Sequence, residues 1–447
     1  MDTDFHFFGT GTAAAHGGFS SDEATLIANA AEFVDFFDSS YWSYWRLKEG
    51  SESRLRIDYP HLSCQTIDWK MVADYDENIW NAFHFPPGNK PHREKEKLQD
   101  YLGGVPVPDW VDDFKHQHLC RNTRLAAEVE PFLCRPFSPF ALHMALDTIN
   151  KYRAISQADQ HQLKELLKKY LGAVPHLAPS DAKSLALVFL GIRMHVLADT
   201  WAHQDFSGIA SKDINAAGTF NDVYASKEFP YVLEDTTWKG TLWALGSDTD
   251  CSAAPDVPGD AACRGHGQMG HYPDYSWLNF VYPASWLKQG HYLVRNNPEQ
   301  YKQAWYWLST VMASCREDIN TRQDLNLKPA PSIPADITRS ITSYHKLDSS
   351  KLSAVAESER VWQDTLLAGD LDLKKRWNHK ANVFDDSMRQ NLGVIGELPT
   401  TRLGTVDIRA GSTLHLMELA SALHYQWCLE WAGKHPDFYW RPVAKGG

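Results

Sequence analysis

Apolar and polar positions alternate at helical period along most of the chain. Ser20 and Glu23 have the spacing of a helix capping box, and apolar residues at helical period follow them. Ser138 stands directly before Pro139, a residue order typical of a helix start. Residues 157–172 place their leucines on one face, as an amphipathic helix does. Strand-like stretches are few and scattered, so the pattern predicts an all-α fold with long irregular loops.

Two further segments are apolar nearly all round, which predicts buried helices. One is SLALVFLGIRMHVLADTWAHQDF at 184–206, with Ser180 as its expected cap, and the other is 411–436. Another helix is expected to start at Asn297, which Pro298 follows. These segments predict a large helical core.

Loops rich in proline and glycine interrupt the helices, and the clearest linker candidate among them is NLKPAPSIPAD at 326–336. We therefore expect a helical core at 1–325, a linker at 326–340 and a C-terminal helical region at 341–447 that packs on the core. No internal repeat is present.

The bulk composition is that of an ordinary globular protein, with 43% hydrophobic and 22% charged residues. The net charge of −12 argues against a protein that coats double-stranded DNA, because such a protein needs a basic face. The charge leaves a small-molecule or phosphoester substrate open, since a bound metal can supply positive charge locally.

Cysteine usage and the absence of a leader predict a cytoplasmic protein. The seven cysteines include no CxxC pair, so neither a disulfide framework nor a thiolate zinc site is indicated. The first residues carry charge and no basic region, unlike a secretory signal. No run approaches the roughly 18 uncharged apolar residues of a membrane span. Leaderless secretion stays open.

Three polar groups interrupt the most apolar segment of the chain. His195, Asp199 and His203 are four residues apart, so on a helix each is turned only about 40° from the previous one. Gly191 precedes them on the same stripe and leaves room for an approaching group. Buried polar groups need partners, and a divalent metal satisfies imidazoles and a carboxylate together. The alternative is a metal-free network in which Asp199 accepts from both rings.

A metal site needs ligands from other segments, and the N-terminal half supplies candidates. Asp4 and His6 lie two residues apart before a Gly–Thr–Gly turn, so both can point the same way from an extended segment. Asp35 lies among phenylalanines in a predicted helix and needs a partner there. We expect all three to join His195, Asp199 and His203 as metal ligands.

A glycine-rich segment, GHGQMGHYPDYSW, supplies His266, His271 and Asp274. We expect His266 or Asp274 to act on the leaving group or to bind substrate, with Asp199 as a further catalytic residue. His84 and His271 are expected to bind substrate. Asp58, His61, His143 and Asp147 are interpreted as structural, and His415 and His424 are nine residues apart, so they cannot share one face of a helix.

Four motifs resemble, in the same order, a widespread microbial family of unknown function. They are DFHFFGT with FVDFFD, FHFPPG, HVLADTWAHQDFSG and GHGQMGHYPDYSWL. The resemblance spans about the first two thirds of the chain and implies no activity.

A more distant similarity is to the superfamily of zinc-dependent phospholipases C and single-strand nucleases. Those proteins are all-α and carry His and Asp ligands on buried helices, with a step like that from His195 to Asp199. The chain departs from them at its first residue, which is Met1 where they have a tryptophan ligand. The histidine–aspartate phosphohydrolase superfamily is a second analogue, but its adjacent His–Asp pair is absent. These similarities imply a helical metal site.

Three function classes follow. The first is a metal-dependent hydrolase, acting most plausibly on a phosphoester, with zinc as the expected ion and iron as the second choice. The second is a non-haem iron oxygenase that uses the same ligands. The third is a non-catalytic, metal-stabilised helical toxin or interaction module.

Overall fold

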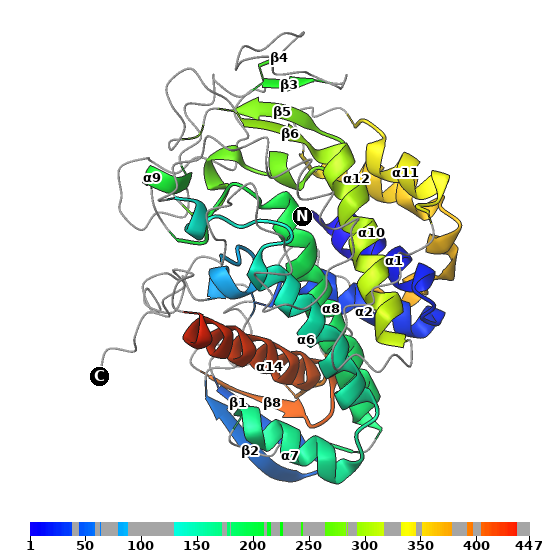
Figure 1. The fold of residues 1–447 in the computed structure, drawn as a ribbon. Helices are drawn as coiled ribbons and strands as arrows, with labels where there is room; N and C mark the ends of the chain where they lie inside the picture. Colours follow the sequence, from blue (N-terminus) through cyan, green and yellow to red (C-terminus); the bar gives the residue numbers. More distant parts are fainter. Residues whose placement is uncertain are drawn as a thin grey trace.

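The computed structural model describes residues 1–37, 44–58, 63, 79–87, 129–171, 177–178, 180–209, 212–215, 224–226, 243–244, 264–282, 284, 293–316, 332–345, 351–377, 391–396 and 404–435. Helices dominate this part of the chain (Figure 1). The longer ones are α2 (Ser21–Phe33), α6 (Pro139–Ser156), α7 (Gln160–Leu171), α8 (Asp181–Ala202), α10 (Asn297–Arg316), α12 (Lys351–Gln363) and α14 (Thr413–Lys434).

Shorter helical elements connect these helices. They are the π-helix η1 (Asp4–Gly9), α1 (Thr10–His16), α9 (Lys212–Asn215), α11 (Ala335–Thr342), and the 3-10 turns η4 (Glu130–Phe132), η7 (Gly267–Met269), η8 (Tyr272–Asp274), η9 (Leu367–Asp370) and η10 (Leu373–Lys375). The predicted helical character is confirmed.

The expectation of an all-α fold is confirmed only in part, because two small four-stranded sheets accompany the helices. One has the order β2-β1-β8-β7, from Glu52–Asp58, Tyr44–Glu49, Thr405–Arg409 and Val394–Ile395. The other has the order β4-β3-β5-β6, from Trp243–Ala244, Tyr224–Ser226, Asn279–Tyr282 and Leu293–Asn296. The strands are short, and β1 pairs in parallel with β8 from the far end of the chain. The residue pattern along the sequence does not reveal a pairing between strands that are so far apart in the chain.

The hairpin formed by β1 and β2 is indicated by the local sequence. β1 and β2 pair antiparallel, and Glu49 lies opposite Glu52 across a two-residue turn. Gly50 adopts φ +60° in that turn, a conformation that glycine allows without strain. The alternation in YWRLKE and ESRLRID on either side was therefore sufficient to predict the hairpin.

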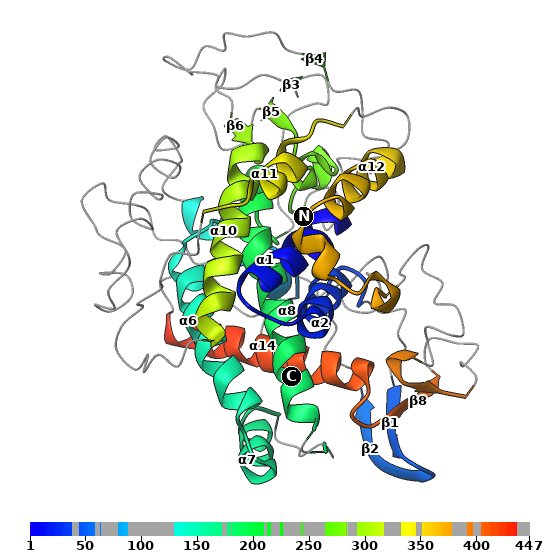
Figure 2. The same ribbon diagram turned by 90° about the vertical axis from the view of Figure 1, so that its right-hand side faces the viewer.

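Helix α8 is the centre of the fold. Every residue from Leu185 to Ala202 is buried, and α2, α6, α10 and α14 all pack against it (Figures 1 and 2). By length and composition α8 is apolar enough to cross a membrane, and among the described helices it alone meets that test. Its apolar window is completely buried within the protein, which is the situation of a core helix.

Gly191 lets α2 approach α8 closely. A Cβ atom at this position would lie 2.5 Å from the Ile27 carbonyl oxygen and 2.7 Å from the Ala30 Cβ. The group that approaches Gly191 is therefore the backbone of α2. As a result the Ala31 carbonyl accepts a hydrogen bond from His195 Nδ1 at 2.8 Å.

Most of the predicted helix starts are confirmed. Ser20 and Glu23 form the capping box, and the Ser138 hydroxyl accepts from the backbone N–H of Ala141 at 3.1 Å. Ser180 is the residue before α8, but its side chain makes no capping bond. Asn297 is the first residue of α10, and the cap is Asn296, whose Oδ1 accepts from the N–H of Glu299.

The C-terminal region completes the core. Helix α14 packs on α8, and His424 Nε2 lies 2.8 Å from the Ala82 carbonyl oxygen. Helix α12 packs on the N-terminal element η1. Part of the expected linker is helical, since α11 begins at Ala335.

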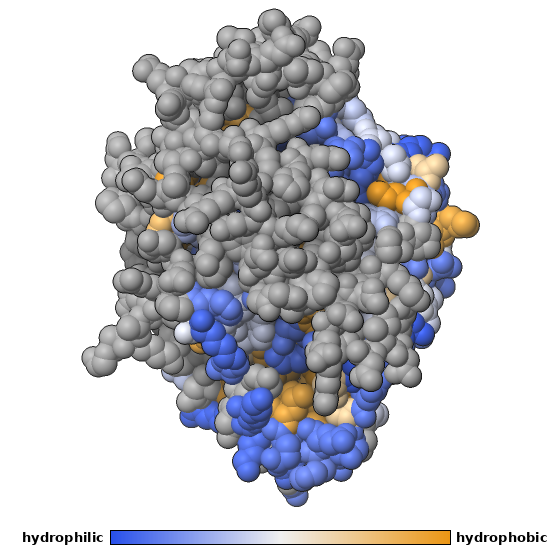
Figure 3. All heavy atoms as spheres, in the orientation of Figure 1, coloured by the Kyte–Doolittle hydropathy of each residue, from blue (hydrophilic) through white to orange (hydrophobic). Residues whose placement is uncertain are grey.

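The described surface is largely hydrophilic on the face shown in Figure 3, with apolar patches at its right and near the bottom. Among the described residues the exposed large apolar side chains are Tyr344, Leu366, Leu373 and Ile395. Scattered apolar residues of this kind are normal on a protein surface.

Replacing Gly191 with Ala should lower the free energy of unfolding by about 1–3 kcal/mol, because the new methyl group forces α2 away from α8. Gly433→Ala is the matched control: Gly433 lies in α14 with nothing within 4 Å of a new Cβ. Equilibrium unfolding in urea compares the two. Equal stability of both variants and the wild type would show that the close approach is not needed.

Candidate metal centre

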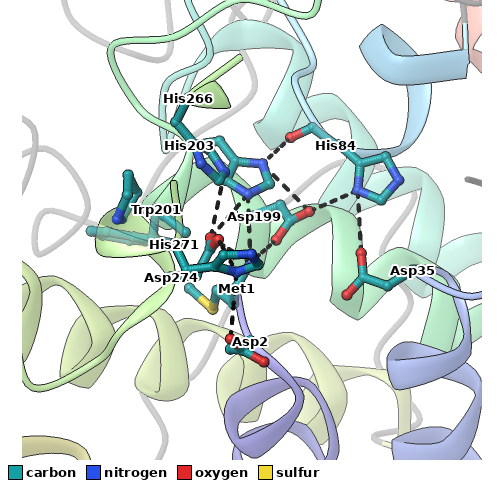
Figure 4. A network of polar contacts seen from close by, with 12 residues as sticks. Met1, Asp2, Asp35, His84, Asp199, Trp201, His203, His266, His271 and Asp274 are labelled. Carbon is teal, nitrogen blue, oxygen red and sulfur yellow. Dashed lines mark hydrogen bonds and ion pairs between the residues drawn. The ribbon is translucent and has the colours of Figure 1, made fainter. Parts of the chain in front are cut away.

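A cluster of histidines and aspartates surrounds the middle and the C-terminal end of α8. Asp199 lies at its centre in Figure 4, with His84 and Asp35 on one side and His203 and Asp274 on the other. The described residues form three groups that could hold a metal ion: His6–His195–Asp199, Asp35–His84–His195 and His203–His266–Asp274.

The first group that we consider consists of Asp35, His84 and His195, together with one oxygen of Asp199. His84 Nδ1 lies 3.3 Å from His195 Nε2, and each of these nitrogens lies 3.7 Å from Asp35 Oδ1. Asp199 Oδ2 is 3.0 Å from His195 Nε2 and 3.2 Å from His84 Nδ1. Two nitrogens and two carboxylate oxygens therefore converge.

Asp35 reaches this group because α2 ends early. A helix was predicted through Asp35, but α2 stops at Phe33 and Asp35 lies in the following turn. In a continued helix the Asp35 N–H would donate to the Ala31 carbonyl. That carbonyl accepts from His195 instead, and the Asp35 N–H lies 3.4 Å from the Glu32 oxygen.

The second group consists of His6 and the remaining oxygens of Asp199 and Asp35. His6 Nε2 is 3.2 Å from Asp199 Oδ1 and 3.6 Å from Asp35 Oδ2. The His6 ring stacks on that of His195 with centroids 3.8 Å apart. Neither nitrogen of the buried His6 ring has the geometry of a hydrogen bond to a described atom. Asp35 and Asp199 thus each contribute one carboxylate oxygen to the first group and the other oxygen to the second group.

The N-terminal segment that carries His6 is ordered and buried, as expected of a ligand-bearing segment. It is helical, however, and the expectation of an extended segment is wrong, because residues Asp4–Gly9 form a π-helix. Helical geometry turns Asp4 away from His6, so Asp4 Oδ2 accepts from the hydroxyl of Ser358 on α12. Burial raises the pKa of Asp4 to about 7. Asp4 belongs to none of the three groups.

The third group consists of His203, His266 and Asp274. Asp274 Oδ1 lies 3.4 Å from His203 Nε2 and 3.5 Å from His266 Nε2. This buried oxygen makes no hydrogen bond to a described residue. His203 follows the last residue of α8 as its C-cap; its Nδ1 lies 3.5 Å from Asp199 Oδ2, and its Nε2 faces Asp274 in a group without His195.

The α-amino group of Met1 lies between the second and third groups (Figure 4). It is 2.7 Å from Asp199 Oδ1 and 3.3 Å from Asp274 Oδ1. Burial lowers the pKa of this amine, but the nearby carboxylates of Asp199 and Asp274 outweigh burial and raise it to about 11. The ammonium group adds one positive charge beside two carboxylates.

Four imidazoles are fixed by hydrogen bonds to backbone carbonyls. In each, one ring nitrogen faces a carbonyl oxygen and the other faces the cluster. The pairs are His195 Nδ1 with Ala31 at 2.8 Å, His203 Nδ1 with His84 at 2.7 Å, His266 Nδ1 with Gly270 at 2.6 Å and His84 Nε2 with Ser63 at 3.0 Å. A carbonyl can only accept, so the nitrogen that faces it donates.

The inner nitrogens of neutral rings fixed in this way have lone pairs and no proton. Burial lowers the pKa of His84, and burial lowers the pKa values of His6 and His266 to about 4, so all three rings are neutral at pH 7. Lone pairs that face carboxylate oxygens repel them. The carbonyl-bound neutral rings of His84 and His266 therefore have no proton to give the carboxylates. Burial lowers the pKa of His195, but the carboxylates of Asp199 and Asp35 outweigh burial and raise it, so His195 can donate to Asp199. A cation would satisfy the nitrogens and the oxygens together.

The distances also fit a small ion. Ligand atoms at about 2.0–2.2 Å from a tetrahedral ion lie about 3.3–3.6 Å from one another. In the first group the separations are 3.0–3.7 Å. In the third group His203 and His266 lie 3.4 and 3.5 Å from the same carboxylate oxygen. These groups could hold a metal ion without a large rearrangement.

Two members of the cluster are partly exposed. The Asp35 side chain is 31% exposed and that of His271 is 33% exposed. His271 Nδ1 lies 3.6 Å from both Asp274 Oδ2 and Asp2 Oδ2. Sequence reasoning missed Asp2 and the Met1 amine, because nothing in the residue pattern distinguishes them.

The structure also locates the remaining candidate residues. His84 and His266 were assigned to substrate and leaving group, but the structure places both in ligand groups. His143 accepts from Trp431, and Asp147 pairs with Arg193 and Lys151. His415 accepts from the N–H of Gly411, and His424 lies against the Ala82 carbonyl. His61 and the side chain of Asp58 lie outside the described residues.

Replacing Asp199 with Asn should weaken metal binding by more than about 100-fold at the groups that it joins, which exceeds the cost of losing an outer-shell partner. The amide offers one neutral oxygen where the carboxylate offers two charged ones. Titration of the apo-protein with zinc measures the loss. Asp22→Asn, which changes an exposed carboxylate paired with Lys375, should bind zinc like the wild type. Unchanged affinity in Asp199→Asn would return this cluster to a hydrogen-bond network.

A family model gives the chain its classification. No curated protein matches it, and no solved structure does. A model of a family of unknown function, DUF6765, matches residues 1–392. The match contains every residue of the cluster and extends well past the two thirds of the chain that the motifs covered. The chain therefore belongs to the DUF6765 family.

Proposed function

We propose that this protein is a metal-dependent hydrolase that cleaves a phosphoester bond. The observation that carries the proposal is the convergence of imidazole nitrogens, four of the rings held by backbone carbonyls, on the carboxylates of Asp35, Asp199 and Asp274 in three adjacent groups. The distant resemblance to zinc-dependent phospholipases C and single-strand nucleases supports the same class.

Zinc is the ion that suits these donors best. Each group combines imidazole nitrogen with carboxylate oxygen and contains no sulfur. Zinc takes such ligands in tetrahedral sites, whereas magnesium and calcium prefer sites made of oxygen alone. Iron binds the same donors and is the second choice.

The charge of the loaded centre favours an anionic substrate. Asp35, Asp199 and Asp274 carry three negative charges among neutral imidazoles. Three divalent ions would outweigh them, so the centre would attract a phosphoryl group although the whole protein carries −12. A bound zinc ion lowers the pKa of a coordinated water toward about 7 and polarises a phosphoryl oxygen.

The chain's own residues then take distinct roles. Asp199 uses both carboxylate oxygens within the cluster, so we assign it as a shared ligand instead of a base. His266 Nε2 lies 3.5 Å from Asp274 Oδ1 within the third group, so we assign both residues as ligands. His271 is the partly exposed histidine beside them, and Asp2 and Asp274 orient its Nδ1. Because His271 is partly exposed, we assign it to binding a substrate that approaches the centre from solvent.

An iron oxygenase is the second candidate. All three groups, His6–His195–Asp199, Asp35–His84–His195 and His203–His266–Asp274, contain two histidines and one carboxylate. That is the ligand set of many non-haem iron oxygenases. The sharing of Asp199 and Asp35 between neighbouring groups favours the hydrolase, because sites with two adjacent ions are typical of phosphatases and nucleases. Metal analysis that finds mainly iron with a visible absorption band would favour the oxygenase.

The zinc-loaded protein should hydrolyse bis(p-nitrophenyl) phosphate or p-nitrophenyl phosphate. His195→Ala should lower the rate by more than about 100-fold, because it removes a ligand and not an outer-shell partner. His161→Ala, which changes an exposed histidine of α7, is the matched control.

A chelator should abolish the activity, and added zinc should restore it. Hydrolysis that persists in the chelator would contradict a metal-dependent mechanism. Tight zinc binding without hydrolysis of either ester would leave the non-catalytic alternative as the better account.

A further inference from the structure

We propose that residues 295–301 form a clamp that fixes the third ligand group by holding both chain segments that carry it. The clamp consists of Arg295, Asn297 and Tyr301, which lie at the end of β6 and the start of α10. All three are buried, yet none belongs to a ligand group. The inference rests on the proposed metal centre and concerns its positioning residues.

Arg295 holds the end of α8, where His203 leaves the helix. Its guanidinium donates to the carbonyls of Trp201 at 3.0 Å, Ala202 at 2.8 Å and Gln204 at 2.9 Å. The last carbonyls of a helix lack partners within it, and a cation is favoured beside them. Gln300 accepts from Arg295 Nε at 3.2 Å and so orients the guanidinium.

An ion pair and a backbone hydrogen bond fix the conformation of the turn that follows α8. Asp205 adopts φ +79°, which is unusual for a residue other than glycine, and its carboxylate pairs with Arg135. The N–H of Phe206 donates back to the His203 carbonyl at 3.2 Å. This turn directs the His203 ring toward Asp274, and Arg295 fixes the helix end from which the turn departs.

Asn297 and Tyr301 hold the segment that carries Asp274. Asn297 Nδ2 lies 3.0 Å from the Tyr272 carbonyl, 3.2 Å from that of Pro273 and 2.9 Å from that of Tyr275. The Tyr301 hydroxyl donates to the Pro273 carbonyl at 2.9 Å. These carbonyls surround η8, which ends at Asp274.

Both sets of contacts come from residues 295–301, so this stretch connects the end of α8 with η8. Asn296 caps α10, so the side chain of Asn297 is free to bind η8. The separation of 3.4 Å between His203 Nε2 and Asp274 Oδ1 therefore depends on residues that touch neither side chain. The clamp's hydrogen bonds go to carbonyls beyond Asp199 at the end of α8 and to those around η8, and its contact with η1 is the packing of Tyr301 on Phe5.

Two clamp variants and two matched controls test the proposal. Arg295→Lys removes the planar donor set, and Tyr301→Phe removes one hydroxyl but keeps the ring that packs on Phe5. Arg153→Lys is the control for the first, because Arg153 also binds last-turn carbonyls, those of Ser314 and Cys315 on α10. Tyr152→Phe is the control for the second and lies in α6 against Phe19.

The apo-protein is titrated with Co²⁺, and binding is followed by equilibrium dialysis and by the visible absorption of each step. The clamp variants should bind one equivalent on the order of 10–100-fold more weakly and lose its part of the spectrum. The remaining equivalents and both controls should match the wild type.

Wild-type affinity for every equivalent in both clamp variants would overturn the clamp while leaving the metal centre intact. Equal weakening of all equivalents would also overturn it, since that result indicates general destabilisation. A wild-type protein that binds no Co²⁺ beyond the first two groups would overturn the third group itself, and the clamp with it. Tyr301→Phe decides the matter if Arg295→Lys does not fold.

Discussion

The structure depends on the desolvation of polar groups inside its central helix. His195 and Asp199 lie on α8 without exposure to solvent, and they meet Asp35 and His84 from other segments. Backbone carbonyls hold the outer nitrogens of His195 and His84, so their inner nitrogens face the carboxylates, and the neutral His84 ring presents a lone pair there. Leaving such groups uncompensated in a core would cost several kcal/mol, on the order of the stability of a whole domain. The Met1 ammonium group, 2.7 Å from Asp199 Oδ1, offsets part of that cost. A metal ion at the centre would offset more, and its binding would then be linked to folding.

The elements around α8 serve to bring ligands to that centre. Gly191 admits the backbone of α2, and the diversion of the Ala31 carbonyl to His195 ends α2 where Asp35 can turn inward. Helix α12 holds the N-terminal π-helix, although more than 300 residues of sequence separate them. Irregular π-helical geometry is uncommon and often occurs at functional sites, and here it carries His6. The C-terminal region, to which the sequence assigned no chemistry, thus helps to place a candidate ligand.

Sequence periodicity predicted the parts of the site that lie on one regular element. The four-residue step from His195 to Asp199 is kept in three dimensions because both residues lie within the buried helix α8. Asp35, His6, His266 and Asp274 were recognised because polar residues in apolar or glycine-rich contexts need partners. His203 was placed in the right cluster but in the wrong group, since the helix end that turns it away is fixed by Arg295, which is distant in sequence. The parallel pairing of β1 with β8 was missed for the same reason, because the two strands are remote along the chain.

Anomalous diffraction from crystals of the zinc-supplied protein tests the central claim most directly. The account predicts a zinc peak enclosed by Asp35, His84, His195 and Asp199, a second peak between His6 and the other oxygens of Asp199 and Asp35, and a third between His203, His266 and Asp274. Each peak should lie at about 2.0–2.2 Å from its nitrogen and oxygen ligands. A cluster with no anomalous peak, in which ring nitrogens donate directly to the carboxylates, would contradict the account.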